Sequence, residues 1–315
     1  MNGLELSRGY YKEYGKPMLE EDFGELLPYL AVGFVGSGSE HYGFDDEVSR
    51  DHDFEPGFCI FLPGEDVVDR RSAFLLERAY AKLPKEYGGI KRQILSPVGG
   101  NRCGVLRTAE FYQNAVGAPD GNLSQEAWLH IPDYALAEAV NGEVFFDNYG
   151  EFSRIRENLK TMPEDIRRKR LAGNLFLMAQ AGQYNYTRCL RHGEKEAAQL
   201  ACVEFVNAAM KAAFLLDGRY MPYYKWSFRA LRQNPERQKL AMQLSFLLGG
   251  DLEDETVSEV KYDTIESIAS DIIAQLQEQN LTHAICGDLE KHAYSVNDTI
   301  TNGELRNRHI LAAID

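Results

Sequence analysis

Two short motifs carry most of the information in this chain: Val35-Gly36-Ser37-Gly38-Ser39 and, roughly a dozen residues later, Asp51-His52-Asp53-Phe54. The first predicts a strand that ends in a small glycine and serine turn, whose backbone N–H groups can meet a phosphate. The second predicts the start of another strand, on which Asp51 and Asp53 would point to the same face. Two convergent carboxylates beside a phosphate cradle suit Mg²⁺, which takes one or two protein carboxylates and completes its shell with phosphate and water.

This order of motifs resembles the nucleotidyltransferase superfamily, which includes DNA polymerase beta and kanamycin nucleotidyltransferase. The resemblance implies an α+β fold with a small mixed sheet in the nucleotidyltransferase domain, followed by a helical bundle. It also implies that Gly36, Ser37 and Ser39 bind a nucleoside triphosphate, with ATP the first choice. Asp51 and Asp53 would be the catalytic residues and the ligands of Mg²⁺ or Mn²⁺.

The second half of the chain resembles a bacterial branch of that superfamily with an added helical domain, the domain of unknown function DUF4037. Two segments carry this resemblance: Gly182-Gln183-Tyr184-Asn185-Tyr186 and Tyr220-Met221-Pro222-Tyr223-Tyr224-Lys225-Trp226. It implies that Lys225 assists the leaving pyrophosphate and that Tyr184 stacks on the base. The residues alone also allow a lysine that extends out of an aromatic core and a tyrosine that only packs.

The sequence departs from the family pattern at the third carboxylate. Active members carry an acid on a later strand, but the matching strand, Arg102–Thr108, has none and places Gly104 at that position. Glu110 lies just beyond and is a poor substitute by register. Three alternatives follow: a base supplied from elsewhere, a substrate that needs none, or a nucleotide-binding regulatory protein without turnover. An antitoxin-like protein is disfavoured because such proteins are usually much shorter.

Composition predicts an intracellular, cytoplasmic globular protein. The chain has 315 residues, 44% hydrophobic and 26% charged, which suggests about two domains with a substantial core. Its five cysteines contain no Cys-x-x-Cys pair, so reduced thiols are expected, with Cys59 and Cys202 in the core. No uninterrupted apolar run reaches ~18 residues, and no membrane partner is expected. A formal charge of −14 argues against generic DNA binding. The expected partners are a nucleotide and an unidentified hydroxyl acceptor, and the oligomeric state stays open.

The expected domains are residues 1–122, an α/β domain, and residues 123–315, a helical domain. In the first, helical spacing links Leu19 to Leu30, strands are predicted at 31–35, 91–95 and 104–108, and a helix is predicted at 66–83 with Asp66 as its N-cap. In the second, helices are predicted at 132–140, 163–183, 194–216, 235–248 and 263–279. An exposed acidic loop is expected at 251–259.

Several polar residues of this sequence are expected to serve structure or solubility. Arg167, Arg168, Lys169 and Arg170 are expected to be mostly solvated, because neighbours on a helix point in different directions. His41 is expected to be a loop residue, although it could touch a phosphate. Arg188, Arg191 and His192 form a basic cluster that suits either a phosphate or a helix end. The other histidines show no metal-ligand spacing, and Walker, Rossmann and serine-hydrolase motifs are absent.

Overall fold

The computed structural model describes residues 1–48, 54–92, 102–250 and 254–314. The chain forms two compact units. Unit 1 contains residues 1–123 and 134–161, and unit 2 contains residues 124–133 and 162–315. The chain first passes from unit 1 to unit 2 after residue 123, close to the boundary expected at residue 122. The segment 134–161, expected in the helical domain, returns to unit 1 instead.

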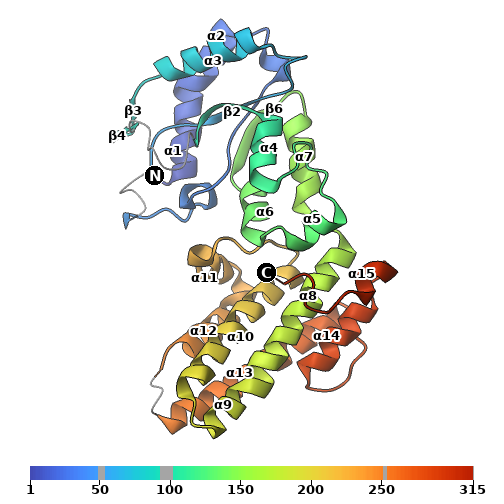
Figure 1. Ribbon diagram of the computed structural model, residues 1–315. Coiled ribbons are helices and arrows are strands. Elements are labelled where there is room, and N and C mark those ends of the chain that lie inside the picture. The colour runs from blue at the N-terminus through green and yellow to red at the C-terminus, as the bar shows by residue number, and fades with distance from the viewer. Residues whose placement is uncertain (49–53, 93–101, 251–253, 315) are drawn as a thin grey trace. The chain divides into compact units, whose positions relative to one another are not determined.

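Unit 1 is built on a four-stranded mixed sheet with the order β5-β2-β1-β6 (Figure 1). Its strands are β1 (Ala31–Phe34), β2 (Cys59–Leu62), β5 (Gly104–Arg107) and β6 (Glu143–Asp147). β1 pairs antiparallel with β2 and β6, and β2 pairs parallel with β5. A separate hairpin joins β3 (Glu86–Tyr87) and β4 (Ile90–Lys91). The strands expected at 31–35 and 104–108 are thus present, and the apolar run at Glu143 is the edge strand.

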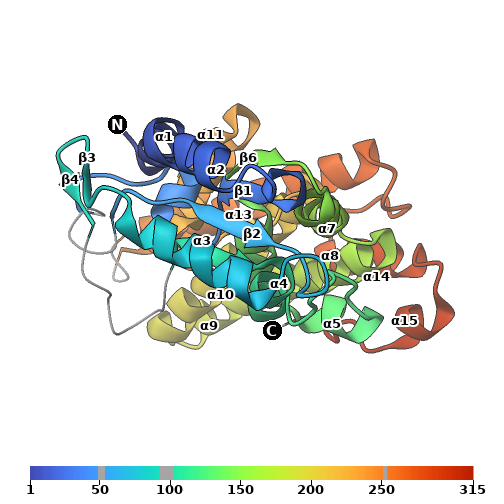
Figure 2. The same ribbon diagram turned by 90° about the horizontal axis from the view of Figure 1, so that it is seen from above.

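Helices cover both faces of this sheet. On one face Val32 and Ile60 belong to a core cluster that also contains Tyr10, Leu19 and Leu76. These residues come from α1 (Gly3–Tyr10), α2 (Lys16–Asp22) and α3 (Arg70–Lys82), and α1 and α2 lie beside β1 in Figure 2. On the other face the Phe61 ring stacks on Phe152 of α7 (Glu151–Lys160) at 4.0 Å and meets Phe111 of α4 (Thr108–Val116) at 5.2 Å. Because successive side chains of β2 point to opposite faces of the sheet, Ile60 and Phe61 pack in two different apolar layers.

Two helix boundaries in unit 1 differ from expectation. α3 begins at Arg70 rather than near Asp66, because the Asp69 carboxylate accepts the N–H of Ser72 at 2.7 Å and so caps the helix. α2 ends at Asp22, so the spacing from Leu19 to Leu30 is not one helix. Gly24 and Pro28 interrupt it, and a short 3₁₀ turn follows. The remaining pieces of unit 1 are the π-helical turn 11–15, the 3₁₀ turn 39–42 and α6 (Asp133–Val140), whose first residue belongs to unit 2.

The described residues of unit 2 form helices and the segments that connect them, without a strand. Its helices are α5 (Gln125–His130), α8 (Glu164–Met178), α9 (Thr187–Arg191), α10 (Lys195–Leu216), α11 (Tyr224–Gln233), α12 (Gln238–Leu248), α13 (Glu255–Glu278), α14 (Leu289–Asp298) and α15 (Gly303–Asn307), with a π-helical segment at 179–186 and a 3₁₀ turn at 235–237. α8 packs against α10 and α14, and α10 also packs against α12 (Figure 1). The expected acidic loop is wrong for its second half, because Asp254 caps α13 and residues 255–259 are helical.

α10 is the core helix of unit 2. Among the described residues it is the one helix long and apolar enough to cross a membrane, but 61% of its most apolar window is buried inside the protein. Helical spacing places Leu200, Val203, Val206, Met210 and Phe214 on one stripe, of which Val206, Met210 and Phe214 are buried. Leu200 and Val203 are 70% and 37% exposed, because Ala198, Cys202 and Phe205 form the buried face of the first half of the helix. Cys59 and Cys202 are buried free thiols, as expected.

Candidate functional site

Four strand ends meet at one edge of the unit 1 sheet. β1 leaves the sheet at Phe34, and the antiparallel strands β2 and β6 enter at that edge. β5 enters there too, since it runs parallel to β2. The edge therefore brings the turn after β1 next to the chain segments that precede Cys59 and Gly104. The predicted turn is present, with positive φ angles at Gly36 (124°) and Gly38 (128°).

The turn is fixed in place by the segment between α6 and β6. The Gly36 N–H donates to Oδ1 of Asn141 at 2.9 Å, and Nδ2 of Asn141 donates back to the Gly36 carbonyl at 2.7 Å. The buried Arg156 in turn donates to the carbonyls of Asn141 and Gly142, at 2.6 and 3.2 Å. Ser37 is left exposed at the tip. The sequence indicated only a helix stop at Asn141, so this clamp was missed.

Replacing Gly142 with alanine should destabilise unit 1 by about 2 kcal/mol or more. Gly142 has φ 66°, and an added Cβ would lie 2.0 Å from the Phe34 carbonyl oxygen, a backbone atom that cannot step aside. Urea unfolding followed by far-UV circular dichroism measures the loss. Gly117→Ala is the matched control, because Gly117 has φ 76° and nothing within 4 Å of an added Cβ. Equal losses for the two variants would show that the contact with Phe34 contributes nothing.

His41 lies underneath the turn and is a core residue, not the loop residue expected. It is 2% exposed, and its ring stacks on Phe34 at 4.0 Å. Burial lowers the pKa of His41 to about 3, and the guanidinium of Arg102 acts in the same direction. The carbonyls of Ser37 and Gly38 oppose this shift, but neither ring nitrogen has a well-formed hydrogen bond in the described part of the chain. The imidazole is therefore neutral and incompletely satisfied.

Glu40 places a second buried group beside the turn. The residue is 9% exposed, and burial raises the pKa of its carboxyl. Nη1 of Arg102 lies 3.4 Å from Oε1 of Glu40, and the Ser39 hydroxyl donates to Oε2 at 3.4 Å. Arg102 lies two residues before β5, at the same sheet edge. Glu40 and Arg102 are site residues that the motif reasoning missed, since neither belongs to a recognisable pattern.

The catalytic pair proposed from the sequence, Asp51 and Asp53, lies outside the described residues, as does His52. The strand that was expected to lack the third carboxylate is β5, and it carries no acid. Glu110 is exposed in the first turn of α4. Within residues 1–48, 54–92, 102–250 and 254–314, no group of three potential ligand side chains could hold a metal ion.

Glu138 is a further carboxylate near this edge. It lies in α6, one turn before the clamping Asn141, so the two face the same side of the helix end. Burial raises the pKa of Glu138, and the charge of Arg102 acts in the opposite direction. Burial raises the pKa of Tyr42, and the charge of Glu138 adds to the rise. The charge of Arg102 thus acts on both Glu40 and Glu138.

The two nucleotide-binding residues proposed in the second half, Lys225 and Tyr184, lie in unit 2. Lys225 is exposed in the first turn of α11, and its Nζ lies 5.3 Å from the ring centre of Trp226. Tyr184 is 61% exposed in the π-helical segment and accepts a hydrogen bond from Arg188 at 3.3 Å. Both side chains are available to a ligand, and their nucleotide roles stay predictions.

The neighbours of Tyr184 in its motif serve the bundle. Nε2 of Gln183 donates to Glu266 of α13 at 3.0 Å, and Oε1 of Gln183 accepts the N–H of Leu289 at the start of α14 at 2.9 Å. Tyr186 is buried and donates to the Ser258 carbonyl at 3.1 Å. This segment therefore joins three helical elements, which explains a distinctive sequence without any ligand.

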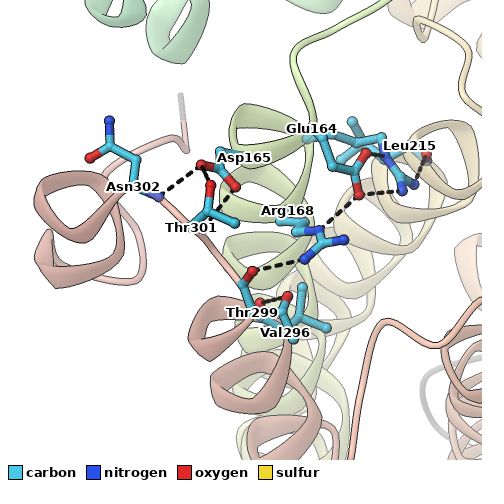
Figure 3. Close-up of polar contacts among 9 residues, drawn as sticks. Glu164, Asp165, Arg168, Leu215, Val296, Thr299, Thr301 and Asn302 are labelled. Atoms are coloured by element: carbon cyan, nitrogen blue, oxygen red, sulfur yellow. Dashed lines mark hydrogen bonds and ion pairs between the residues drawn. The ribbon is translucent and has the colours of Figure 1, made fainter.

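The basic run in α8 is paired and largely buried, so the expectation that it is solvated is wrong. Arg168 donates to Glu164 and to the Thr299 carbonyl, each at 2.8 Å, as Figure 3 shows. Lys169 is fully buried and donates to Asn297 at 2.8 Å and to the Arg308 carbonyl at 2.7 Å. Arg170 is 4% exposed and pairs with Asp133 at 2.6 Å. Long side chains reach acceptors on several neighbouring segments, which helical spacing alone cannot reveal.

A family model matches residues 128–227. This stretch includes α8, the π-helical segment and the start of α11. The chain carries a DUF4037 domain. This family is described as a domain of unknown function. No curated protein and no solved structure matches the chain.

The DUF4037 domain does not follow the boundaries of the two units. It takes in part of unit 1, with Glu138, Asn141 and Arg156, and part of unit 2, with Tyr184 and Lys225. The glycine turn and Arg102 precede it in the sequence. The clamp on Gly36 therefore joins the DUF4037 domain to the turn that precedes it.

Proposed function

We propose that this protein is a Mg²⁺-dependent nucleotidyltransferase, which moves a nucleoside monophosphate from a nucleoside triphosphate to a hydroxyl acceptor. The observation that carries this proposal is the sheet edge. A glycine turn at the end of β1, with Ser37 exposed, lies beside the start of β2, and Asp51 and Asp53 precede β2 by a few residues in the sequence. The mixed strand order is compatible with the family resemblance.

In this proposal Gly36, Ser37 and Ser39 orient the outer phosphates: Ser37 and Ser39 through backbone N–H groups and hydroxyls, and Gly36, whose own N–H is bonded to Asn141, by shaping the turn. The carboxylate oxygens of Asp51 and Asp53 are the donor type that suits Mg²⁺, which when bound neutralises charge on the triphosphate. The acceptor oxygen forms a bond to the α-phosphorus while the bond to the bridging oxygen breaks. Lys225 stabilises the pyrophosphate that leaves. Such catalysis relies mainly on positioning and electrostatics.

Thermal unfolding of the wild type and Asp51→Asn, with a panel of nucleoside triphosphates and with Mg²⁺ or EDTA, tests this function. A ligand at about a hundred times its dissociation constant stabilises by roughly 2.7 kcal/mol, or several degrees. We expect a Mg²⁺-dependent shift in the wild type that disappears in Asp51→Asn. Asp46→Asn, the same change five residues earlier in the sequence, should keep the shift. No shift with any triphosphate, or a full shift in Asp51→Asn, would contradict the proposal.

A second candidate is a nucleotide-binding regulatory protein without turnover. It is favoured by β5, which carries no carboxylate, and by the exposure of Glu110. Pyrophosphate release, measured with small-molecule, protein and RNA acceptors, separates the two. Release that is lost in Asp51→Asn supports the enzyme. Mg²⁺-dependent nucleotide binding with no release from any acceptor supports the regulatory protein.

A further inference from the structure

The carboxylate of Glu40 lies directly against Gly38 of the glycine turn. A Cβ built on Gly38 would lie 2.2 Å from Oε1 and 2.6 Å from Oε2 of Glu40, so the carboxylate fills the space where a side chain would begin. The Cβ of Glu40 packs against Gly3 at the start of α1, since a Cβ built on Gly3 would lie 2.4 Å from it. The Glu40 carboxylate, an anionic group of the chain itself, thus lies against Gly38 of the turn.

Three potential donors converge on this carboxylate. They are Nη1 of Arg102 at 3.4 Å, the Ser39 hydroxyl at 3.4 Å and Nδ1 of His41 at 3.6 Å. Charge-assisted hydrogen bonds that hold a carboxylate well are shorter, at about 2.7–2.9 Å. The three contacts to Glu40 are therefore longer than those of a tightly held carboxylate.

The surroundings of Glu40 only partly compensate for the burial of its charge. Burial raises the pKa of Glu40 and Asp45 adds to the rise, while the Glu40 backbone N–H, Arg102 and Ser39 act in the opposite direction. The His41 side chain is 1% exposed, and its nitrogens lack a well-formed hydrogen bond in the described part of the chain. A purely structural ion pair would instead be close and fully bonded, because burying an unsatisfied charge or imidazole destabilises the fold.

We propose that Gly38, Ser39, His41 and Arg102 form the pocket of a phosphate group, and that the Glu40 carboxylate occupies this pocket as an internal plug until a polyphosphate displaces it. A phosphate has more oxygens than a carboxylate and can accept from the guanidinium, the hydroxyl and the imidazole N–H together. This inference deepens the proposed function and rests on it for the ligand class, since the same turn would receive the outer phosphates of a nucleoside triphosphate.

The test measures binding of inorganic triphosphate to the whole chain by isothermal titration calorimetry, in EDTA so that the metal site plays no part. When a plug occupies a site, the apparent affinity falls by the fraction of time the site is open. Glu40→Gln keeps the shape and removes the charge, so it should bind triphosphate about tenfold tighter than the wild type. Arg102→Gln should bind about tenfold weaker.

Two further variants separate a plug from a general charge effect. Glu110→Gln removes one exposed carboxylate from the same unit and should leave the affinity unchanged within about twofold. Glu40→Asp keeps the charge but withdraws it from Gly38, so it should also tighten binding. It serves as well if Glu40→Gln fails to fold.

Weaker or unchanged binding in both Glu40 variants would overturn the plug, as would an equal gain in Glu110→Gln. Absence of triphosphate binding in every protein would overturn the pocket itself. These results are independent of Mg²⁺ and of turnover. The proposed function can therefore fail in the Asp51→Asn experiment while the pocket is confirmed, and the reverse can also happen.

Discussion

Arg170→Met is expected to destabilise unit 2 by about 3–5 kcal/mol. Arg170 is 4% exposed, and its Nη1 donates to Oδ1 of Asp133 at 2.6 Å. Its Nη2 also donates to the carbonyls of Leu129 and Ile131. Methionine fills a similar volume but cannot donate hydrogen bonds. The Asp133 carboxylate, whose side chain is 10% exposed, and the two carbonyls therefore lose the guanidinium as a partner. Urea unfolding followed by tryptophan fluorescence measures the loss in unit 2 alone, because both tryptophans, Trp128 and Trp226, lie there.

The matched control is an exposed ion pair in the same unit. Lys239 lies 2.5 Å from Asp271, with side chains 65% and 44% exposed, so Lys239→Met should cost less than about 1 kcal/mol. Adding Asp133→Asn to Arg170→Met should recover part of the stability, because it removes the buried charge. Similar losses for Arg170→Met and Lys239→Met, or no recovery in the double variant, would show that the pair is not a buried electrostatic contact.

His41→Phe is expected to make unit 1 more resistant to acid than the wild type. The folded protein holds the pKa of His41 at about 3, below its ordinary 6.5, so only the unfolded chain takes up this proton between those values. Stability from this group is complete above pH 6.5 and is lost as the pH falls toward 3. Linkage gives a loss of about 3 kcal/mol between pH 7 and pH 4, which phenylalanine removes while keeping the stacked ring.

Urea unfolding at pH 7 and pH 4, followed by far-UV circular dichroism, measures this difference. Acidification titrates Glu40 and other carboxylates in both proteins, so the comparison of wild type with His41→Phe isolates the histidine. Tryptophan fluorescence, which reports on unit 2, should respond equally in the two proteins. An identical acid response of unit 1 in both proteins would mean that His41 is protonated in the folded state.

The sequence predicted the first strand and the turn because their signals are local. An apolar run that ends in Gly36-Ser37 has few alternatives to a strand followed by a turn, and β1 ends at Phe34. Long-range features were missed for the opposite reason. The clamp on Gly36 comes from Asn141, and the contact to Glu40 comes from Arg102. Both partners are distant in sequence from the turn that they contact. Only the strand pairing that brings those segments to one sheet edge makes such contacts visible.

The helical unit shows a similar limit. Apolar spacing located the helices, but it could not show which long polar side chains are buried. Lys169 and Arg170 look solvated by composition, yet backbone carbonyls near Arg308 and Ile131 accept from them. Carbonyl acceptors are part of every residue and leave no mark in the sequence. For that reason the basic run is the largest error of the sequence reasoning.

The edge strand β6 has a consequence for the order in which the chain folds during synthesis. β6 pairs with β1, and its residues 143–147 emerge after the chain has already contributed 124–133 to unit 2. Until then one side of β1 has unpaired N–H and C=O groups, a ready template for another strand. Unit 1 therefore completes its sheet only after residues 143–147 have been synthesised. A chain that stops at residue 122 would keep that edge open and be prone to aggregation.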